Sequence, residues 1–383
     1  MSFVHLHLHT QYSLLDGANK IKELLPRVKA AGMPACAITD HGNMFGAVQF
    51  HAEAVKHGIK PIIGCEMYVA PKSRFDKEGR IDDYEAGGNY HLILLATNRD
   101  GYRNLCKLVS AGFAEGFHYK PRVDKELLRE LNGGIIALSG CLRGEIAHNI
   151  MVGQKERAFA AAEDLNTIFK DRFYLEIQDN HLDKQEVVNA ELIELAKKTG
   201  IPLVGTNDCH YLSCEDSAAH EALLCIQTGK TFSDERRWKF ETDQLFVKSP
   251  AQMEKAFAHV PGAVSTTLDI AARCDFEFKQ KFQFPVYAVP QGETLEAVLE
   301  RDTRQGLDDR LNASMVDSAE AKRDAPALVS AAWSSRLPHC VVLSNTKYLI
   351  RHRHCGDGLA QTRGQPCSMS LSWAAVQRVS APH

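Results

Sequence analysis

The chain has 383 residues, of which 44% are hydrophobic and 24% charged, and its formal net charge is -3. This length and composition predict one large α/β domain with a smaller region beside it. The net charge argues against a protein that coats nucleic acid by bulk electrostatics, although a local basic groove is compatible with it. Strand-sized apolar runs, the lack of a signal-peptide pattern and eleven scattered cysteines predict a cytoplasmic protein with no membrane partner.

Strands and amphipathic helices alternate through the first two hundred residues. The segment FVHLHL (residues 3–8) is typical of a strand, and the segment after it repeats apolar residues at helical spacing. Later strand candidates, separated by helices except for a charged loop over residues 72–88, are ACAITD, KPIIGCEMYVA, NYHLILLAT, GIIALSG, FYLEIQ and PLVGTND. Such alternation predicts parallel pairing through right-handed crossovers, and six or seven units predict a closed or nearly closed β/α barrel.

Beyond this domain, expected over residues 1–282, the pattern changes twice. Pro285, Pro290 and Gly292 mark a boundary, and a charged helix follows within residues 283–314. Residues 315–383 keep neither a helical nor a strand period, and after residue 325 Asp357 is the single acidic residue. We expect this tail to be disordered, or an out-of-frame or chimeric end. A genomic read across the codons for residues 310–330 tests this hypothesis, and an intact in-frame match would refute it.

Three histidines alternate near the start of the chain, at positions 5, 7 and 9. In a regular strand their imidazoles point the same way, and Leu6 and Leu8 point to the opposite side, into a core. Neutral imidazole is the commonest side-chain metal ligand. We therefore interpret His7 and His9 as the first wall of a metal site, with His5 behind them.

Residues that can ligate metals recur where the predicted strands end, which is where β/α barrels carry their active sites. These candidates are His7, His9, Asp16, Asp40, His41, Glu66, His91, Cys141, Asp208 and His210. Mixed imidazoles and carboxylates suit Zn²⁺, Mn²⁺ or Fe²⁺ better than Mg²⁺. With about four protein ligands per site, two or three metals sharing a carboxylate would use this set. Clustered metals are typical of phosphoester hydrolysis.

Simpler interpretations stay open for several of these residues. The histidine row could be a polar strand face, Asp40 could cap the following helix, and Cys141 could be a small buried apolar residue. In FHYKPR (residues 117–122), His118 and Tyr119 with Lys120 and Arg122 could contact phosphates, although a solvated charged loop is the simpler interpretation.

The motifs HLHLHTQYSLLDG, ITDHGNMFGAVQF, IKPIIGCEMYVAP, IIALSGCLRGEI and VGTNDCHYL resemble the PHP (polymerase and histidinol phosphatase) domain family. The resemblance is strongest to its branch in bacterial replicative DNA polymerase III alpha subunits, and it runs from residue 1 to about residue 310. It implies a distorted (β/α)7, TIM-like barrel with three metal ions, followed by a short helical start of the polymerase region. The ligands that it implies are His7, His9, Asp16, His41, Glu66, His91, Cys141, Asp208 and His210, with Asp16 one residue beyond the corresponding histidine of stand-alone members.

None of these ligands is replaced, which favours retained 3′–5′ exonuclease chemistry at a DNA 3′ end. Asp208, His210 and His9 are then the expected catalytic residues, with Asp208 or a nearby histidine accepting the proton. Two alternatives stay open. The first is a metal-stabilised scaffold that docks the proofreading exonuclease subunit, as the family's PHP domain does, and the second is a small-molecule phosphatase of the histidinol phosphatase type.

The sequence also departs from the polymerase pattern. The family's palm carries an Asp-x-Asp pair for the nucleotide and its metals, and this chain has no aspartates at that spacing. We therefore expect no DNA polymerisation by this chain alone, and we expect other holoenzyme subunits to bind through parts that it lacks.

Overall fold

The computed structural model of the chain describes residues 2–14, 16–78, 88–279 and 288–312. Most of these residues belong to one structural unit, Met1–Gln280, and the rest to a second, Lys281–His383. In the second unit the described element is α11 (Leu295–Asn312). The tail predicted to be disordered, residues 315–383, lies outside the described residues.

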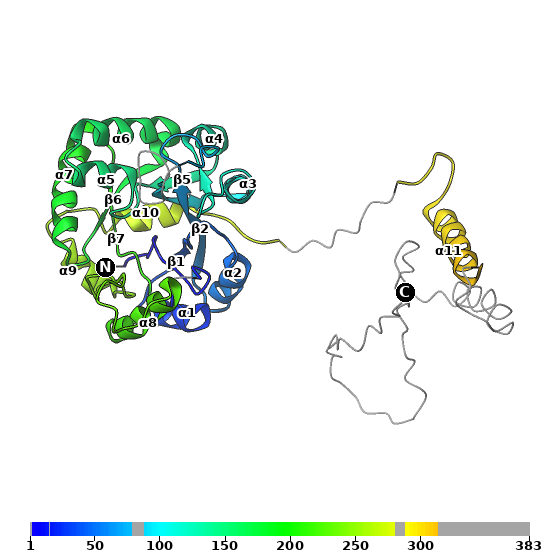
Figure 1. The fold of residues 1–383 in the computed structure, drawn as a ribbon, viewed down its shortest axis with the longest axis horizontal. Coiled ribbons are helices and arrows are strands. Elements are labelled where there is room, and N and C mark those ends of the chain that lie inside the picture. Colours follow the sequence, from blue (N-terminus) through cyan, green and yellow to red (C-terminus); the bar gives the residue numbers. More distant parts are fainter. Residues whose placement is uncertain (1, 15, 79–87, 280–287, 313–383) are drawn as a thin grey trace, which may run out of the picture. The chain divides into compact units, whose positions relative to one another are not determined.

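A curled mixed sheet forms the centre of the first unit (Figure 1). Its strands follow the order β1-β2-β3-β5-β6-β7, and β4 pairs with β2. The strands are β1 (Ala35–Ile38), β2 (Lys60–Val69), β3 (Tyr90–Ala96), β4 (Arg122–Val123), β5 (Ile135–Leu138), β6 (Phe173–Gln178) and β7 (Leu203–Thr206). Parallel pairs join β1 to β2, β5 to β6 and β6 to β7. The fold is the distorted TIM-like α/β arrangement that the sequence predicts.

Strand β3 runs opposite to the prediction, because it pairs antiparallel with both β2 and β5. The described residues between β2 and β3 (70–78 and 88–89) contain no helix. A parallel neighbour needs a long crossover, whereas a direct return gives an antiparallel one. The reversal places the start of β3 at the edge where β2 ends, so that His91 pairs with Tyr68.

The first predicted strand is an irregular segment that closes the barrel. His5 bridges to Cys36 of β1, and Leu8 bridges to Cys209 beyond β7, both in parallel orientation. The amide of His9 donates to the carbonyl of Cys209 at 2.8 Å, and a bend lies at His7. The segment therefore sits between the two ends of the sheet, which gives the nearly closed barrel expected from the sequence.

Helices surround the strands (Figure 1). They are α1 (Ile21–Ala30), α2 (Ala47–Lys56), α3 (Arg99–Ala114), α4 (Lys125–Leu131), α5 (Glu145–Met151), α6 (Lys155–Phe169), α7 (Asp183–Thr199), α8 (Ser217–Thr228), α9 (Pro250–Ala256) and α10 (Thr266–Arg273), with 3-10 turns η1 (Lys170–Arg172) and η2 (Cys214–Asp216). The side chain of Asn98 caps α3, and that of Asp124 caps α4. No helix in the described ranges has the length and apolar character needed to cross a membrane.

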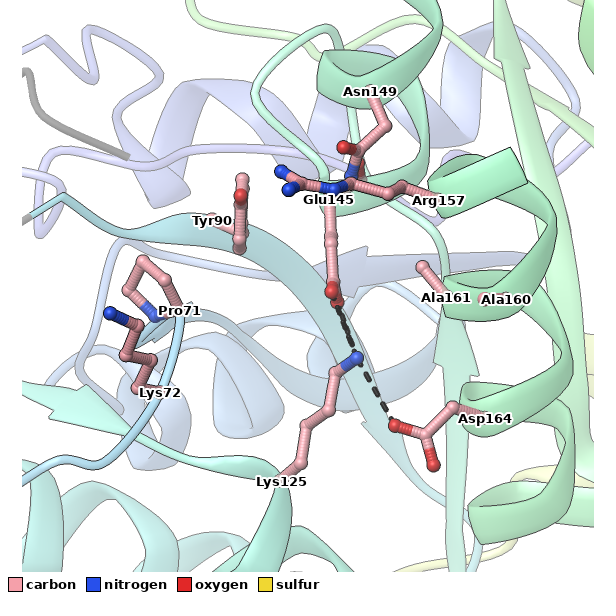
Figure 2. A pocket seen from close by; sticks show the side chains of 10 residues that line it. All are labelled: Pro71, Lys72, Tyr90, Lys125, Glu145, Asn149, Arg157, Ala160, Ala161 and Asp164. Atoms are coloured by element: carbon pink, nitrogen blue, oxygen red, sulfur yellow. Dashed lines mark hydrogen bonds and ion pairs between the residues drawn. The ribbon is translucent and has the colours of Figure 1, made fainter. Parts of the chain in front are cut away.

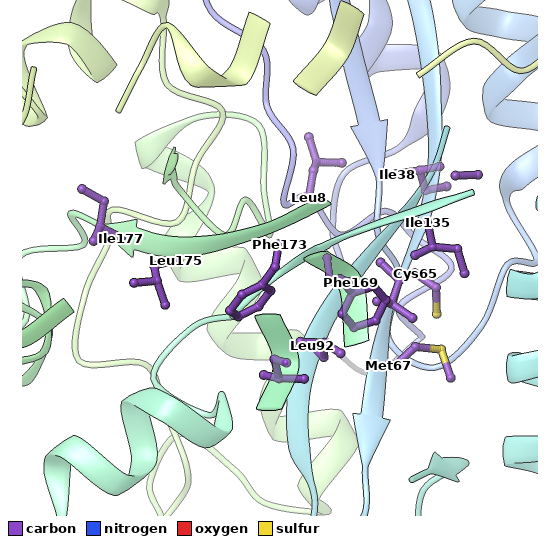
Figure 3. Packing of buried hydrophobic residues seen from close by; sticks show 14 of the residues in the cluster. Leu8, Ile38, Cys65, Met67, Leu92, Ile135, Phe169, Phe173, Leu175 and Ile177 are labelled. Carbon is purple, nitrogen blue, oxygen red and sulfur yellow. The ribbon is translucent and has the colours of Figure 1, made fainter. Parts of the chain in front are cut away.

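The two faces of the sheet pack into separate apolar clusters. The outer cluster joins strands to helices, with Cys65, Met67, Phe169 and Phe173 among its members (Figure 3). The inner cluster fills one end of the barrel and includes Val4, Leu6, Ile62, Ile93, Leu95, Ile136, Leu138, Tyr174 and Val204. Side chains two residues apart share a face of a strand. The inner face therefore continues from these apolar residues to Glu66, His91, Glu176 and Asp208 at the other end.

Candidate metal centre

Imidazoles and carboxylates converge at the polar end of the barrel. Three groups of ligand atoms each lie within 4.8 Å of one another. They are His9 with His41 and His210, His7 with His9 and Glu66, and His41 with Glu66 and His91. His9, His41 and Glu66 each belong to two groups, so the three groups form one connected cluster.

Glu66, at the end of β2, lies at the centre of this cluster and is fully buried. Its Oε1 is 2.8 Å from Nδ1 of His91 and 3.4 Å from Nε2 of His7, and its Oε2 contacts Nδ1 of His41. Burial alone would raise the pKa of Glu66, but the charges of His91 and His41 outweigh it and hold that pKa well below its ordinary value. Glu66 is therefore a carboxylate that faces several imidazoles at once.

Asp208 and Asp16 approach the same imidazoles from two loops. Oδ1 of Asp208 is 3.1 Å from Nε2 of both His7 and His9, and 3.5 Å from Nδ1 of His210. Asp208 has a left-handed backbone, with φ of 51°, a conformation that is uncommon outside glycine and costs free energy. Oδ2 of Asp16 is 3.2 Å from Nε2 of His41. Both carboxylates thus extend the cluster beyond Glu66.

The chemistry of these donors fits transition-metal ions. Five buried atoms of the cluster make no hydrogen bond among the described residues: Asp16 Oδ1, His41 Nδ1, Glu66 Oε2, His91 Nε2 and Asp208 Oδ1. Buried polar atoms are normally paired by hydrogen bonds. Several of these five instead lie in close carboxylate–imidazole contacts, an arrangement that a cation between them would satisfy. Burial, together with the charges of His41 and His210, lowers the pKa of His9 to about 3, which keeps its imidazole in the neutral form that ligates metal.

Cys141 and His5, two further candidates from the sequence, lie outside the three close groups. Sγ of Cys141 lies 3.8 Å from Nδ1 of His91, beside the cluster but outside the three close groups. His5, predicted to face the same way as His7, instead has Nε2 2.9 Å from the carbonyl oxygen of Lys248. The bend at His7 breaks the strand alternation and separates the two rings.

Asp40 shapes a loop and does not cap the following helix. Its carboxylate accepts hydrogen bonds from the amide and hydroxyl of Thr10 and from the hydroxyl of Ser13, at 2.6–2.8 Å. The N-cap position of α2 belongs to Gly46. Asp40 therefore holds the loop that carries Asp16 against the barrel.

The two cations of the FHYKPR segment have different surroundings, since Arg122 is buried and Lys120 is partly exposed. Arg122 is fully buried, and its guanidinium donates to the carbonyls of Gly116 and Asp76, so neither a phosphate contact nor a solvated loop describes it. Nζ of Lys120 lies 5.4 Å from the ring centroid of Tyr68, which in turn stacks on His41. Lys120 is thus the cation of this segment that lies near the cluster.

Sequence reasoning missed Glu176, which is almost fully buried in β6. Its Oε1 is 2.7 Å from Nδ1 of His7, and it accepts hydrogen bonds from Gln178, Thr206 and the amide of Gly140. This arrangement fixes the orientation of the His7 ring. The signal was the alternation in FYLEIQ, where Glu176 and Gln178 share a face with Tyr174.

Two cavities are relevant to the location of function. A cavity of about 160 Å³ adjoins the cluster and is lined by Asp16, His41, His91, Cys141, Asp208 and His210, among others. A larger cavity, of about 550 Å³, lies between α5, α6 and the start of β3, where Lys125 pairs with Glu145 and Asp164 (Figure 2). None of the residues that line the larger cavity belongs to the cluster, so we place the candidate site at the smaller one.

The chain is similar to known proteins across most of its length. Residues 5–180 match the PHP domain family. The DNA polymerase III subunits alpha of Treponema pallidum and Thermus aquaticus are each 45% identical, over 85% and 80% of this chain and 28% and 26% of their own lengths. The corresponding protein of Mycobacterium tuberculosis is 43% identical over 82% of this chain and 28% of its own length. The chain thus spans roughly a quarter of these curated relatives.

Among solved structures, a protein of Bifidobacterium adolescentis, provisionally assigned as a metal-dependent phosphoesterase, covers 67% of this chain and 95% of its own. Its sequence identity is 12% and its TM-score 0.34.

Proposed function

From the premise that this chain carries a PHP domain and matches the N-terminal part of DNA polymerase III alpha subunits, we propose that it hydrolyses phosphodiester bonds at a DNA 3′ end. The reaction is a metal-dependent 3′–5′ exonuclease step, set in DNA replication in the cytoplasm. The observation that carries the proposal is the cluster of buried carboxylate oxygens and imidazole nitrogens that face one another at the polar end of the barrel, five of them without a standard hydrogen bond among the described residues.

The metal ligands in this proposal come from every part of the barrel edge. They are His7, His9, Asp16, His41, Glu66, His91, Cys141, Asp208 and His210. Two or three Zn²⁺, Mn²⁺ or Fe²⁺ ions would share Glu66, since it lies in two of the close groups. When bound, such ions supply Lewis acidity that lowers the pKa of water and offsets charge on a phosphoryl group.

The protein's own groups would position the strand and move the proton. Lys120, beside Tyr68 and near Asp16, and Arg143, which lines the adjoining cavity, supply positive charge for a phosphate. Asp208, His210 and His9 stand close together as acceptors for the proton of the attacking water, with Oδ1 of Asp208 3.5 Å from Nδ1 of His210. Glu176 would hold His7 in place from behind.

The test is turnover by the full chain on a single-stranded oligonucleotide labelled at its 3′ end, with added Mn²⁺ or Zn²⁺. His9→Ala should abolish release of the terminal nucleotide, because His9 belongs to two of the three close groups. His57→Ala is the matched control, since His57 lies at the end of α2 and pairs with Glu53. Release that is unchanged in His9→Ala would refute the proposal.

The same preparation separates the two other functions. A metal-stabilised scaffold would bind metal and capture the proofreading exonuclease subunit without releasing nucleotide from DNA. A small-molecule phosphatase would hydrolyse histidinol phosphate and leave the oligonucleotide intact.

A further inference from the structure

The cavity beside the cluster has an aromatic side and an amide side. We propose that it binds the nucleobase of the 3′-terminal nucleotide and selects bases that carry an exocyclic amino group. This inference rests on the proposed function in one respect, because it takes the terminus of a DNA strand as the occupant. The aromatic and amide residues that carry it lie outside the predicted metal ligands.

Trp238 and Phe240 form the aromatic side. Both line the cavity, their ring centroids are 5.0 Å apart, and Phe240 lies 5.3 Å from the ring of His210. Trp238 is 42% exposed, so part of its ring is open to solvent beside the cavity. Aromatic rings next to a phosphoester site offer a surface on which a base stacks.

Asn180 and Gln185 form the amide side, and each is 3% exposed. Among the described residues, Oδ1 of Asn180 and Oε1 of Gln185 make no hydrogen bond although they are buried. A buried acceptor without a partner lowers the stability of the fold, because it has lost its hydrogen bonds to water. Two such oxygens beside one cavity point to an occupant that donates hydrogen bonds.

The orientation of the Asn180 amide follows from its neighbours. The carboxylate of Glu176 can only accept, so the group of Gln178 that is 3.0 Å from it must be its NH₂. The oxygen of Gln178 then accepts from Nδ2 of Asn180 at 3.3 Å. The remaining atom of Asn180, the unpaired one, is therefore its oxygen.

An independent chain of hydrogen bonds orients Gln185. Nδ2 of Asn189 donates to the backbone carbonyl of Gln178 at 2.7 Å, and a carbonyl can only accept. The oxygen of Asn189 is then free to accept from Nε2 of Gln185 at 2.9 Å. The unpaired atom of Gln185 is also an acceptor, so both amides present oxygen.

These acceptors distinguish among bases. Adenine, cytosine and guanine each carry an exocyclic amino group with two N–H donors, whereas thymine offers a single N–H donor, its ring N3–H, between two carbonyl oxygens. A site built to accept from an amino group discriminates against an analogue that lacks it, because the single donor of thymine can pair with one of the two oxygens and leaves the other unpaired. Thymine should therefore bind at least about fivefold more weakly than the other three bases.

The experiment measures binding of the four deoxynucleosides to the full chain by equilibrium dialysis. Deoxynucleosides carry no phosphate, so the result does not depend on hydrolysis. Trp238→Ala should weaken binding of deoxyadenosine about 5- to 150-fold, which is the range for loss of one stacked base. Phe159→Ala, which removes a partly exposed aromatic from α6, is the matched control and should leave binding unchanged.

Gln185→Leu tests the acceptor directly. It keeps the volume of the side chain but removes the unpaired oxygen, so it should reduce the preference for deoxyadenosine over thymidine. Trp238→Leu replaces Trp238→Ala if the latter fails to fold, which a melting curve reveals.

The outcomes separate this inference from the proposed function. Equal binding of all four deoxynucleosides, or no loss in either Trp238 variant, would overturn the base site even if the oligonucleotide is hydrolysed. Base binding with the expected preference, in a protein that releases no nucleotide from DNA, would support the base site and refute the exonuclease proposal.

Discussion

Replacing Glu176 by Gln tests whether this buried carboxylate holds the cluster together. Oε1 of Glu176 faces three donors, from His7, Gln178 and Thr206, whereas Oε2 faces one, the amide of Gly140 at 3.1 Å. The glutamine will therefore keep its oxygen toward the three donors and turn its NH₂ toward the amide of Gly140. One hydrogen bond is lost there, at a cost of about 1–3 kcal/mol to the free energy of unfolding.

The larger effect of Glu176→Gln should be on metal binding. A carboxylate on Nδ1 of a ligating imidazole fixes the ring and raises its basicity, and losing such a group typically costs about 10- to 100-fold in metal affinity. The assay is competition with a chromophoric chelator, together with urea unfolding of the metal-free protein. Glu163→Gln, on the exposed side of α6, is the control. An affinity within about twofold of wild type, in a folded variant, would refute the role of Glu176.

Three further expectations follow from the same structure. Removing metal with a chelator should lower the melting temperature, because a ligand at 100 times its dissociation constant adds about 2.7 kcal/mol to the folded state; an unchanged melting temperature would contradict the metal centre. Arg122→Met should lower the free energy of unfolding in urea by about 2–3 kcal/mol, because the carbonyls of Gly116 and Asp76 lose their donor. The control Arg103→Met, at an exposed position of α3, should lower it by less than about 0.5 kcal/mol. Burial lowers the pKa of His51 below 6.5, so the unfolded chain binds a proton more readily than the folded chain, and His51 reduces the stability of the fold as pH falls below that value. The melting temperature of His51→Phe, relative to that of wild type, should therefore rise between about pH 7.5 and about pH 5.5. A difference in melting temperature that stays constant over this range would contradict the expectation.

The sequence predicts the barrel and the members of the metal cluster better than their detailed arrangement. The i, i+2 spacing of His7 and His9, and of Asp208 and His210, does place each pair in one cluster. The direction of β3 was predicted wrongly, because a hydrophobic run reveals a strand but not its partner. The charged loop before β3 indicated the antiparallel direction, because its sequence has no helical period and a parallel strand needs a crossover that is usually a helix.

Buried polar residues without a reactive motif were the hardest to find. Glu176 was overlooked because a single carboxylate in an apolar run resembles an exposed position of an edge strand. Arg122 was interpreted as part of a charged loop, yet the carbonyls that it satisfies come from segments 6 and 46 residues away in the chain. Contacts of this kind depend on tertiary packing, and local composition does not encode them.

The departures from a regular barrel fall at the candidate metal centre, and geometry explains why. In a regular strand, residues two apart are separated by about 6.6 Å along the chain. His7 and His9 nevertheless bring their Nε2 atoms to within 3.1 Å of each other and of Oδ1 of Asp208. The bend at His7 lies between the converging residues, and Asp208, with its left-handed backbone, approaches them from the neighbouring parallel segment that follows β7. Local strain of this kind persists where the surrounding structure enforces it, and here it falls where the imidazoles and carboxylates of the cluster converge.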